Sequence, residues 1–102
     1  MTEEHLPVPN VLFYASQGGH ANLLAMYGEY SNGKGVNSRG EYGETPLHWA
    51  AMVGAGSCVE VLSALGADIA VTDVNGRTPA QVALRYGHHA VAELISRHTR
   101  KG

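Results

Sequence analysis

Apolar residues recur along this chain with the period of a helix, in short segments separated by glycine. One such segment covers residues 47–53 and a second covers 80–86, and each stops at a glycine. A further segment follows each glycine, with apolar residues three and four positions apart at 58–65 and at 91–95. This spacing places apolar side chains on one face of a helix. The pattern therefore predicts two successive helix-turn-helix units.

The two predicted units are copies of one another. Thr45-Pro46 recurs as Thr78-Pro79, and the same offset relates Gly54 to Gly87. In each copy the threonine can cap a helix whose first residue is proline, where a missing N–H costs nothing. Gln81 is placed to complete a capping box in the second copy. A period of about 33 residues predicts a stack of repeats in which each unit buries its apolar face against the next.

The residues of the middle unit resemble those of a known family. Residues 43–51, Gly-Glu-Thr-Pro-Leu-His-Trp-Ala-Ala, are similar to the ankyrin signature Gly-x-Thr-Pro-Leu-His-x-Ala-Ala, and Gly-Ala-Asp-Ile at 66–69 is similar to the family's exit from the second helix. The third unit matches more loosely, and a degenerate unit precedes the middle one. The resemblance implies an all-α ankyrin-repeat solenoid of about three helix-turn-helix units with short hairpin fingers. It implies a single domain over 1–102, with repeats at about 9–38, 39–71 and 72–102.

The degenerate first unit carries two extra residues. The interval from Gly19 to Gly33 is longer by that amount than the equivalent interval from Gly54 to Gly66, which places the insertion near 28–32. Glycine and small polar residues are frequent from there to residue 43, and this composition predicts a long, mobile finger with Tyr30 and Tyr42 as its adhesive elements. An insertion that is tolerated only because it lies at the surface is the alternative.

The ankyrin resemblance implies a concave surface that binds a partner protein, built from the fingers and the exposed side of the first helices. Aromatic and Arg residues on such a surface are typical of interface hot spots. Trp49 aligns with Tyr14 and Val82, which predicts a row across adjacent first helices. The alternatives are that Trp49 and Tyr14 pack between repeats, and that Arg77 pairs with Glu44 on the finger surface. The predicted partner-binding residues are Tyr14, Arg39, Glu41, Tyr42, Glu44, Trp49, Met52, Val74, Asn75, Arg77, Arg85 and Tyr86.

The composition favours some classes of function and disfavours others. A formal charge of −2 argues against a nucleic-acid partner, which needs clustered Lys and Arg. No apolar run approaches the ~20 residues that cross a bilayer, so no membrane partner is expected. The single cysteine, Cys58, forms no intrachain disulfide and fits a reducing compartment, the cytoplasm or the nucleus. A monomer is expected, with self-association as the alternative.

The sequence offers few residues that could catalyse a reaction or bind a metal. The six histidines show no Cys-x-x-Cys or His-Glu-x-x-His spacing, so no metal site and no cofactor are expected. Cys58 falls on an apolar helix face and no serine has an evident base, so no catalytic residue is assigned. Asn37 aligns with a finger asparagine, and the family resemblance makes it a hypothetical site of asparagine hydroxylation. The sequence therefore predicts a protein–protein interaction module without catalysis; the alternative is a regulatory or targeting segment of a larger enzyme or scaffold protein.

Overall fold

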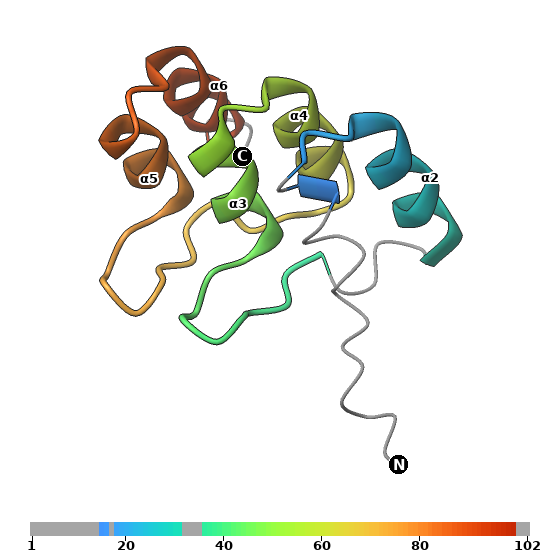
Figure 1. The fold of residues 1–102 in the computed structure, drawn as a ribbon, viewed down its shortest axis with the longest axis horizontal. Helices are drawn as coiled ribbons and strands as arrows, with labels where there is room; N and C mark the ends of the chain where they lie inside the picture. Colours follow the sequence, from blue (N-terminus) through green and yellow to red (C-terminus); the bar gives the residue numbers. More distant parts are fainter. Residues whose placement is uncertain (1–14, 17, 32–35, 100–102) are drawn as a thin grey trace.

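The structure, a computed structural model, describes residues 15–16, 18–31 and 36–99. Ala15 and Ser16 are helical, and this part of the chain holds five labelled helices and no strand (Figure 1). The all-α prediction is therefore confirmed for the described residues. No helix among them combines the length and the apolar character needed to cross a bilayer. The helices are α2 (Ala21–Ser31), α3 (Pro46–Val53), α4 (Gly56–Ala64), α5 (Pro79–Arg85) and α6 (His89–Thr99).

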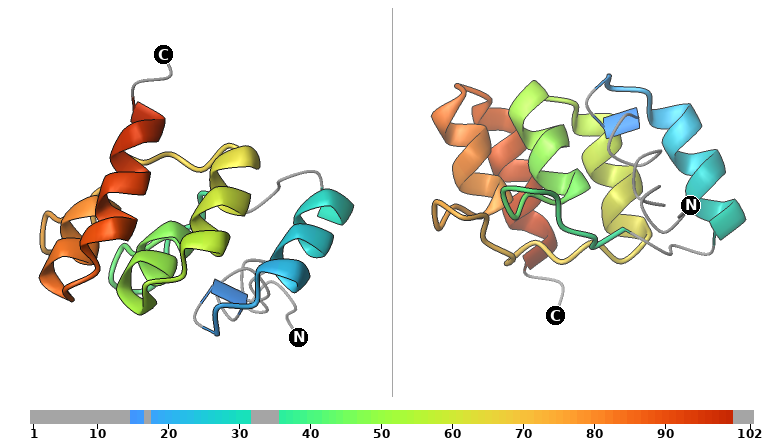
Figure 2. Two further views of the ribbon diagram at one scale, coloured as in Figure 1. Left: turned by 90° about the horizontal axis from the view of Figure 1, so that it is seen from above. Right: turned by 60° about the horizontal axis from the view of Figure 1, so that its bottom comes forward.

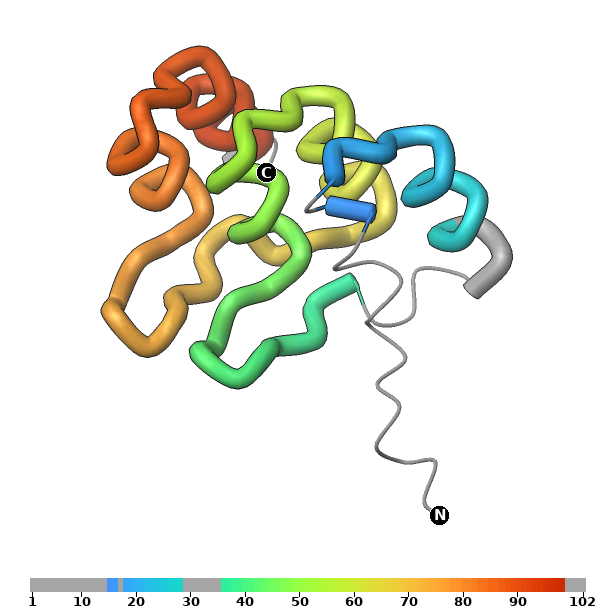
Figure 3. The backbone as a smooth tube through the Cα atoms, in the orientation of Figure 1, coloured from blue at the N-terminus to red at the C-terminus, as the bar shows by residue number. Residues whose placement is uncertain are grey.

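The helices lie in two layers. Figure 2 shows α2, α4 and α6 side by side in one layer, with α3 and α5 in the other. Helix α4 occupies the centre, because it packs against α2 and α6 on either side and against α3 in the other layer. The loops that precede α3 and α5 project together from one edge as two fingers (Figures 1 and 3). The predicted repeat boundaries at 38/39 and 71/72 fall within these loops.

The first helices begin where the sequence predicts, because their caps are formed by local side chains. At α5 the Gln81 N–H donates to Thr78 Oγ1 (3.3 Å) and the Thr78 N–H donates to Gln81 Oε1 (2.9 Å), which confirms the predicted capping box. Helix α3 has a second capping box, in which His48 plays the role of Gln81 for Thr45. Helix α3 ends at Val53 and is capped by Gly54, whose φ of 75° lies in the left-handed region that favours glycine.

The middle repeat forms the centre of the hydrophobic core. Its buried apolar side chains come from both α3 and α4, whereas Leu24 is the fully buried apolar side chain among residues 21–28 of α2. A middle repeat has a neighbour on each side, so the apolar faces of both helices are shielded from water. The fully buried apolar residues of α3 and α4 are Leu47, Ala50, Ala51, Cys58, Val59 and Leu62.

The prediction that a finger begins near Gly28 is wrong. Residues 28–31 belong to α2, which has 11 residues where α4 has nine, so the extra residues lengthen a helix. Gly28 is buried, and a Cβ added there would overlap Cδ1 of Leu65 on the neighbouring repeat. The missing side chain thus lets α2 approach α4 closely. Tyr30 lies on this helix and Tyr42 on the finger before α3; residues 32–35 lie outside the described residues.

Candidate functional site

A concavity of about 240 Å³ lies where α3, α5 and the two fingers meet. Two adjacent repeats build it, because its lining residues come in equivalent pairs one repeat apart, such as Trp49 with Val82 and Met52 with Arg85. It contains eight of the residues that the sequence predicts for partner binding. The lining residues are Tyr42, Glu44, Trp49, Met52, Asp73, Asn75, Arg77, Val82, Arg85 and Tyr86, and this set is called the groove below.

Aromatic side chains dominate the apolar surface of the groove. Tyr42 is 63% exposed and Tyr86 is 53% exposed, in agreement with the positions predicted for them on a finger and at the rim. Trp49 is partly buried and lines the groove. Trp49 and Met52 lie three positions apart on α3 and therefore share a helix face. Val82, which is 3% exposed, forms the floor.

Hydrogen bonds between the repeats fix the two fingers relative to one another. The Val74 N–H donates to the Tyr42 carbonyl oxygen (2.9 Å), and the Arg39 guanidinium donates to the carbonyl oxygen of Thr72. Nε2 of the buried His48 lies 2.9 Å from the carbonyl oxygen of Arg77, at the base of the second finger. Because these contacts lie within the protein itself, they hold the two fingers in place and reduce the order that has to be gained on binding.

Both carboxylates of the groove bind backbone N–H groups of their own finger. Asp73 Oδ1 accepts hydrogen bonds from the N–H groups of Asn75 (2.9 Å) and Arg77 (3.0 Å). Desolvation raises the pKa of Asp73, but these hydrogen bonds and the electrostatic influence of His48 and Arg77 outweigh it and hold that pKa below its ordinary value. Glu44 Oε1 accepts from the Tyr42 N–H (2.8 Å). Glu44 and Arg77, both among the described residues, form no ion pair. The alternative interpretation, in which these two side chains pair on the finger surface, is therefore wrong.

The two guanidinium groups of the groove have no partner within the described part of the chain. Neither the Arg77 nor the Arg85 side chain takes part in a hydrogen bond or an ion pair there. Arg77 is partly buried and attracts the Asp73 carboxylate, whereas Arg85 is exposed in the last turn of α5. The groove therefore offers unpaired hydrogen-bond donors beside an aromatic wall.

Three of the predicted partner-binding residues that the structure describes do not line the groove. Arg39 is committed to its bond with Thr72, Glu41 is exposed on the first finger, and Val74 is 66% exposed on the second. Tyr14 lies outside the described residues. The structure adds Asp73 and Val82 to the site. Asp73 could have been found from the sequence, because Asp before Asn-Gly is a turn signal whose side chain caps the turn.

Asn37 lies away from the groove, at the junction between the first two repeats. Its side-chain amide donates to the Gly66 carbonyl oxygen (3.2 Å), and its Oδ1 accepts from the Asp68 N–H (2.7 Å). The exposed side chain therefore ties two successive repeat exits together. Hydroxylation of this residue stays a hypothesis.

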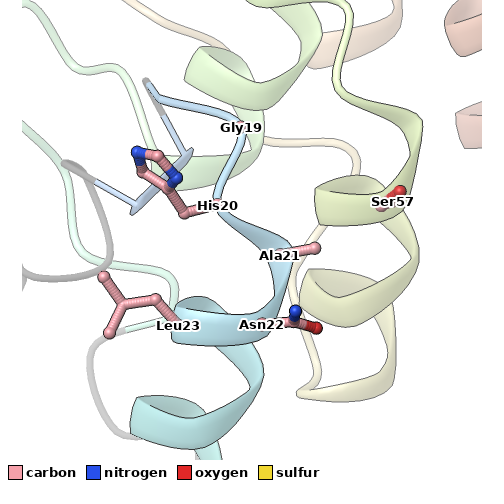
Figure 4. Close-up of a pocket in the computed structure, with 6 residues that line it drawn as sticks. All are labelled: Gly19, His20, Ala21, Asn22, Leu23 and Ser57. Atoms are coloured by element: carbon pink, nitrogen blue, oxygen red, sulfur yellow. The ribbon is translucent and has the colours of Figure 1, made fainter.

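A second concavity, of about 640 Å³, lies between α2 and α4 near their first turns (Figure 4). Figure 4 shows Ala21 and Asn22 facing Ser57 across it, while His20 and Leu23 project away from Ser57. Its polar side chains do not converge on a common point, so it assembles no chemistry. Within the described ranges, no cluster of three or more His, Cys, Asp or Glu side chains is placed to hold a metal ion.

Comparison with known proteins agrees with this geometry. The family model described as ankyrin repeats (3 copies) matches residues 12–101. Ankyrin repeat domain-containing protein 37 of Mus musculus is 35% identical over 82 residues, which cover 80% of this chain and 50% of that protein. Target of rapamycin complex 2 subunit AVO2 of Saccharomyces cerevisiae is 46% identical over 60 residues, 59% of this chain and 14% of that protein. ARF GTPase-activating protein GIT1 of Homo sapiens is 51% identical over 55 residues, 54% of this chain and 7% of that protein. The matched segments thus cover half or less of each of these relatives.

Proposed function

This chain belongs to the ankyrin-repeat family, and from that premise we propose that it is a protein-binding module that holds its partner in the groove. One observation carries the proposal: residues selected from the family's variable positions meet in a single concavity built by two adjacent repeats. A binding surface with exposed Tyr and unpaired Arg has the composition of an interface hot spot.

The groove is the anchor of the proposed interface rather than the whole of it. Stable protein interfaces use roughly 20–30 residues on each side, whereas ten residues line the groove. Arg39, Glu41 and Val74 lie on the same two fingers and supply the surrounding rim. Truncation of a groove side chain should therefore weaken partner binding strongly, and truncation of a rim side chain only slightly.

We further propose that the module does not catalyse a reaction. Its two groove carboxylates are occupied by backbone donors, which leaves them poorly placed to act as general bases. The Cys58 thiol is fully buried, and desolvation raises its pKa, so little of it is in the nucleophilic thiolate form.

A pull-down with a groove variant tests the binding function. The whole chain and a Trp49→Ala, Arg85→Ala, Tyr86→Ala variant are immobilised, exposed to cell lysate and compared by quantitative mass spectrometry. Glu93→Ala, which removes an exposed side chain of α6 outside the groove, is the matched control. Each variant is first shown to melt cooperatively with unchanged helical content.

We expect a protein that the parent and the control retain and the groove variant loses. If the groove variant retains the same partner as the parent, the assignment of binding to the groove is wrong. The large concavity between α2 and α4 is then the next surface to be substituted.

A second candidate function has support of its own. The three relatives named above are longer than the segments they share with this chain, and two of their names denote a subunit of a complex and a GTPase-activating protein. On this proposal the chain acts as a regulatory or targeting segment, and the groove holds another part of the same polypeptide. Sequencing the native reading frame past Gly102 distinguishes the two candidates, because the second requires a continuing chain.

We also propose a monomer that resides in the cytoplasm or the nucleus. A buried, free Cys58 is consistent with a reducing compartment. Leu23 and Met26, which are 46% and 65% exposed on one face of α2, are the surface through which two copies would associate. Light scattering over a dilution series tests this, since a mass that rises with concentration contradicts a monomer.

A further inference from the structure

We propose that the groove recognises an acidic peptide segment with one large apolar side chain, and that Arg85 pairs with a carboxylate of that segment. The proposal rests on the protein-binding function proposed above and names the chemistry of the partner at the same site.

The hydrogen bonds already made within the groove indicate which charge its partner carries. The carboxylates of Glu44 and Asp73 already accept backbone N–H groups, so neither needs a basic partner for satisfaction. The guanidinium groups of Arg77 and Arg85 each present a fork of donors without an acceptor among the described residues. A planar fork of N–H donors matches a carboxylate, which can accept two parallel hydrogen bonds.

Of the two guanidinium groups, that of Arg85 is the better site for a carboxylate. Arg77 attracts the Asp73 carboxylate and helps to lower its pKa, so part of the Arg77 charge is balanced within the finger. Arg85 makes no such contribution and is exposed at the opposite end of α5 from that finger. It is therefore the cation that an incoming acidic side chain meets without competition.

The side chains around Arg85 indicate that the partner also presents an apolar side chain. Met52 occupies the equivalent position on α3, one repeat earlier, and Trp49 lies on the same face one turn away. Tyr86 follows Arg85 directly and lines the same groove. A volume of about 240 Å³ is below the ~300–1,000 Å³ typical of small-molecule sites, so it suits one inserted side chain better than a cofactor.

The length of the groove sets the length of the segment. Arg77 lies on the finger just before the N-cap of α5 and Arg85 is the last residue of that helix, whose seven residues rise by ~1.5 Å each and so span ~10 Å. An extended peptide advances by ~3.3 Å per residue. About three or four residues of the partner therefore lie along the groove, which is enough for one apolar side chain with an acidic residue beside it.

Peptide selection tests the proposal directly, since the library itself supplies the candidate partner sequences. A phage-displayed library of random short peptides is selected on the whole chain, and the binders are measured by fluorescence anisotropy against three variants. Arg85→Glu reverses the proposed carboxylate site, and Trp49→Ala removes the apolar wall. Arg97→Glu makes the same charge change at an exposed position of α6 outside the groove and is the matched control.

We expect selected peptides in which Asp or Glu flanks an aromatic or large aliphatic residue. Arg85→Glu should weaken their binding about tenfold or more, because it replaces attraction by repulsion between like charges. Arg97→Glu should leave their affinity unchanged. A peptide with Lys in place of the acidic residue should bind Arg85→Glu better than it binds the parent.

The other outcomes overturn the inference, and they separate it from the binding function. Neutral or basic peptides that lose affinity with Trp49→Ala refute the acidic partner but leave the groove as a binding site. An equal loss with Arg97→Glu shows attraction by overall charge alone and refutes the role of Arg85. Peptides that are insensitive to both groove variants contradict the inference and the proposed function together. If no peptide is enriched, the inference fails, and the lysate pull-down alone decides the function.

Discussion

His48 joins two repeats through one imidazole ring, so its replacement tests how far hydrogen bonds couple the repeats. The ring is 1% exposed; Nδ1 accepts from the Thr45 N–H (3.1 Å), and Nε2 lies 2.9 Å from the Arg77 carbonyl oxygen. A nitrogen that faces a carbonyl oxygen must carry the hydrogen, so the neutral ring is protonated at Nε2. His48→Ala removes both contacts at once.

The cost of His48→Ala follows from the groups that lose a partner. A buried donor or acceptor left unsatisfied costs about 1–3 kcal/mol, and the buried Thr45 N–H and the partly buried Arg77 carbonyl are two such groups. With the lost packing of the ring, the free energy of unfolding should fall by about 3–5 kcal/mol. Gln81 occupies the equivalent position but caps only its own helix from an exposed site. Gln81→Ala should therefore cost about 1 kcal/mol, the usual value of a cap.

Urea unfolding followed by circular dichroism measures this difference, with the m-value confirming that each variant unfolds in one cooperative step. His48→Gln is the control for volume, because glutamine can keep the cap while the ring and its bond to Arg77 are lost. Its cost should lie between those of His48→Ala and Gln81→Ala. If His48→Ala and Gln81→Ala lower the free energy of unfolding equally, the bond between repeats does not stabilise the fold and the reasoning is refuted.

Three further predictions test the core, a helix end and a finger. Leu62→Ala truncates a fully buried side chain and should lower the free energy of unfolding by about 2–5 kcal/mol in the same titration; a loss below about 1 kcal/mol would place Leu62 outside the core. Gly54→Ala should lower the melting temperature more than Gly76→Ala, because φ is positive at both (75° and 77°) but an added Cβ meets the His88 ring at 2.7 Å only at Gly54; equal shifts would contradict this. Asp73 has a lowered pKa when folded, so its stabilisation is present above the unfolded pKa of about 3.9 and is lost as the pH falls through the lower folded value. The difference in urea midpoint between the parent and Asp73→Ala should therefore shrink as the pH is lowered below about 4, and a difference that is independent of pH would refute the role of the charge.

The ends of the first helices were predictable because their causes are local. Thr45 and Thr78 cap the helices that follow them, and Pro46 and Pro79 supply the first residue of each. The predicted segments 47–53 and 80–86 differ by one residue from the observed bounds of α3 and α5. A cap, a proline and a glycine with positive φ act within a few residues of one another, so a sequence repeated at one offset produces the same helix twice.

The candidate site was predictable in outline for a related reason. Positions one repeat period apart stand side by side in a stack, so alignment of the repeats brings Trp49 beside Val82 and Met52 beside Arg85. Alignment does not show which polar side chains are already paired. The alternative interpretation paired the carboxylate of Glu44 with Arg77, but that carboxylate binds the backbone of its own finger.

The sequence by itself determined the family, the helical class and the two local caps, because each of these depends on residues close together in the chain or on the repeat period. Only the tertiary structure decided where the extra residues of the first repeat go. Gly28 lies within α2, where Leu65, from the next repeat, occupies the space that a side chain would take. It also decided that Arg39 is committed to Thr72 while Arg85, among the residues described, is unpaired. Both outcomes depend on contacts between repeats, and a pattern of residue types does not carry the distances that determine which groups meet.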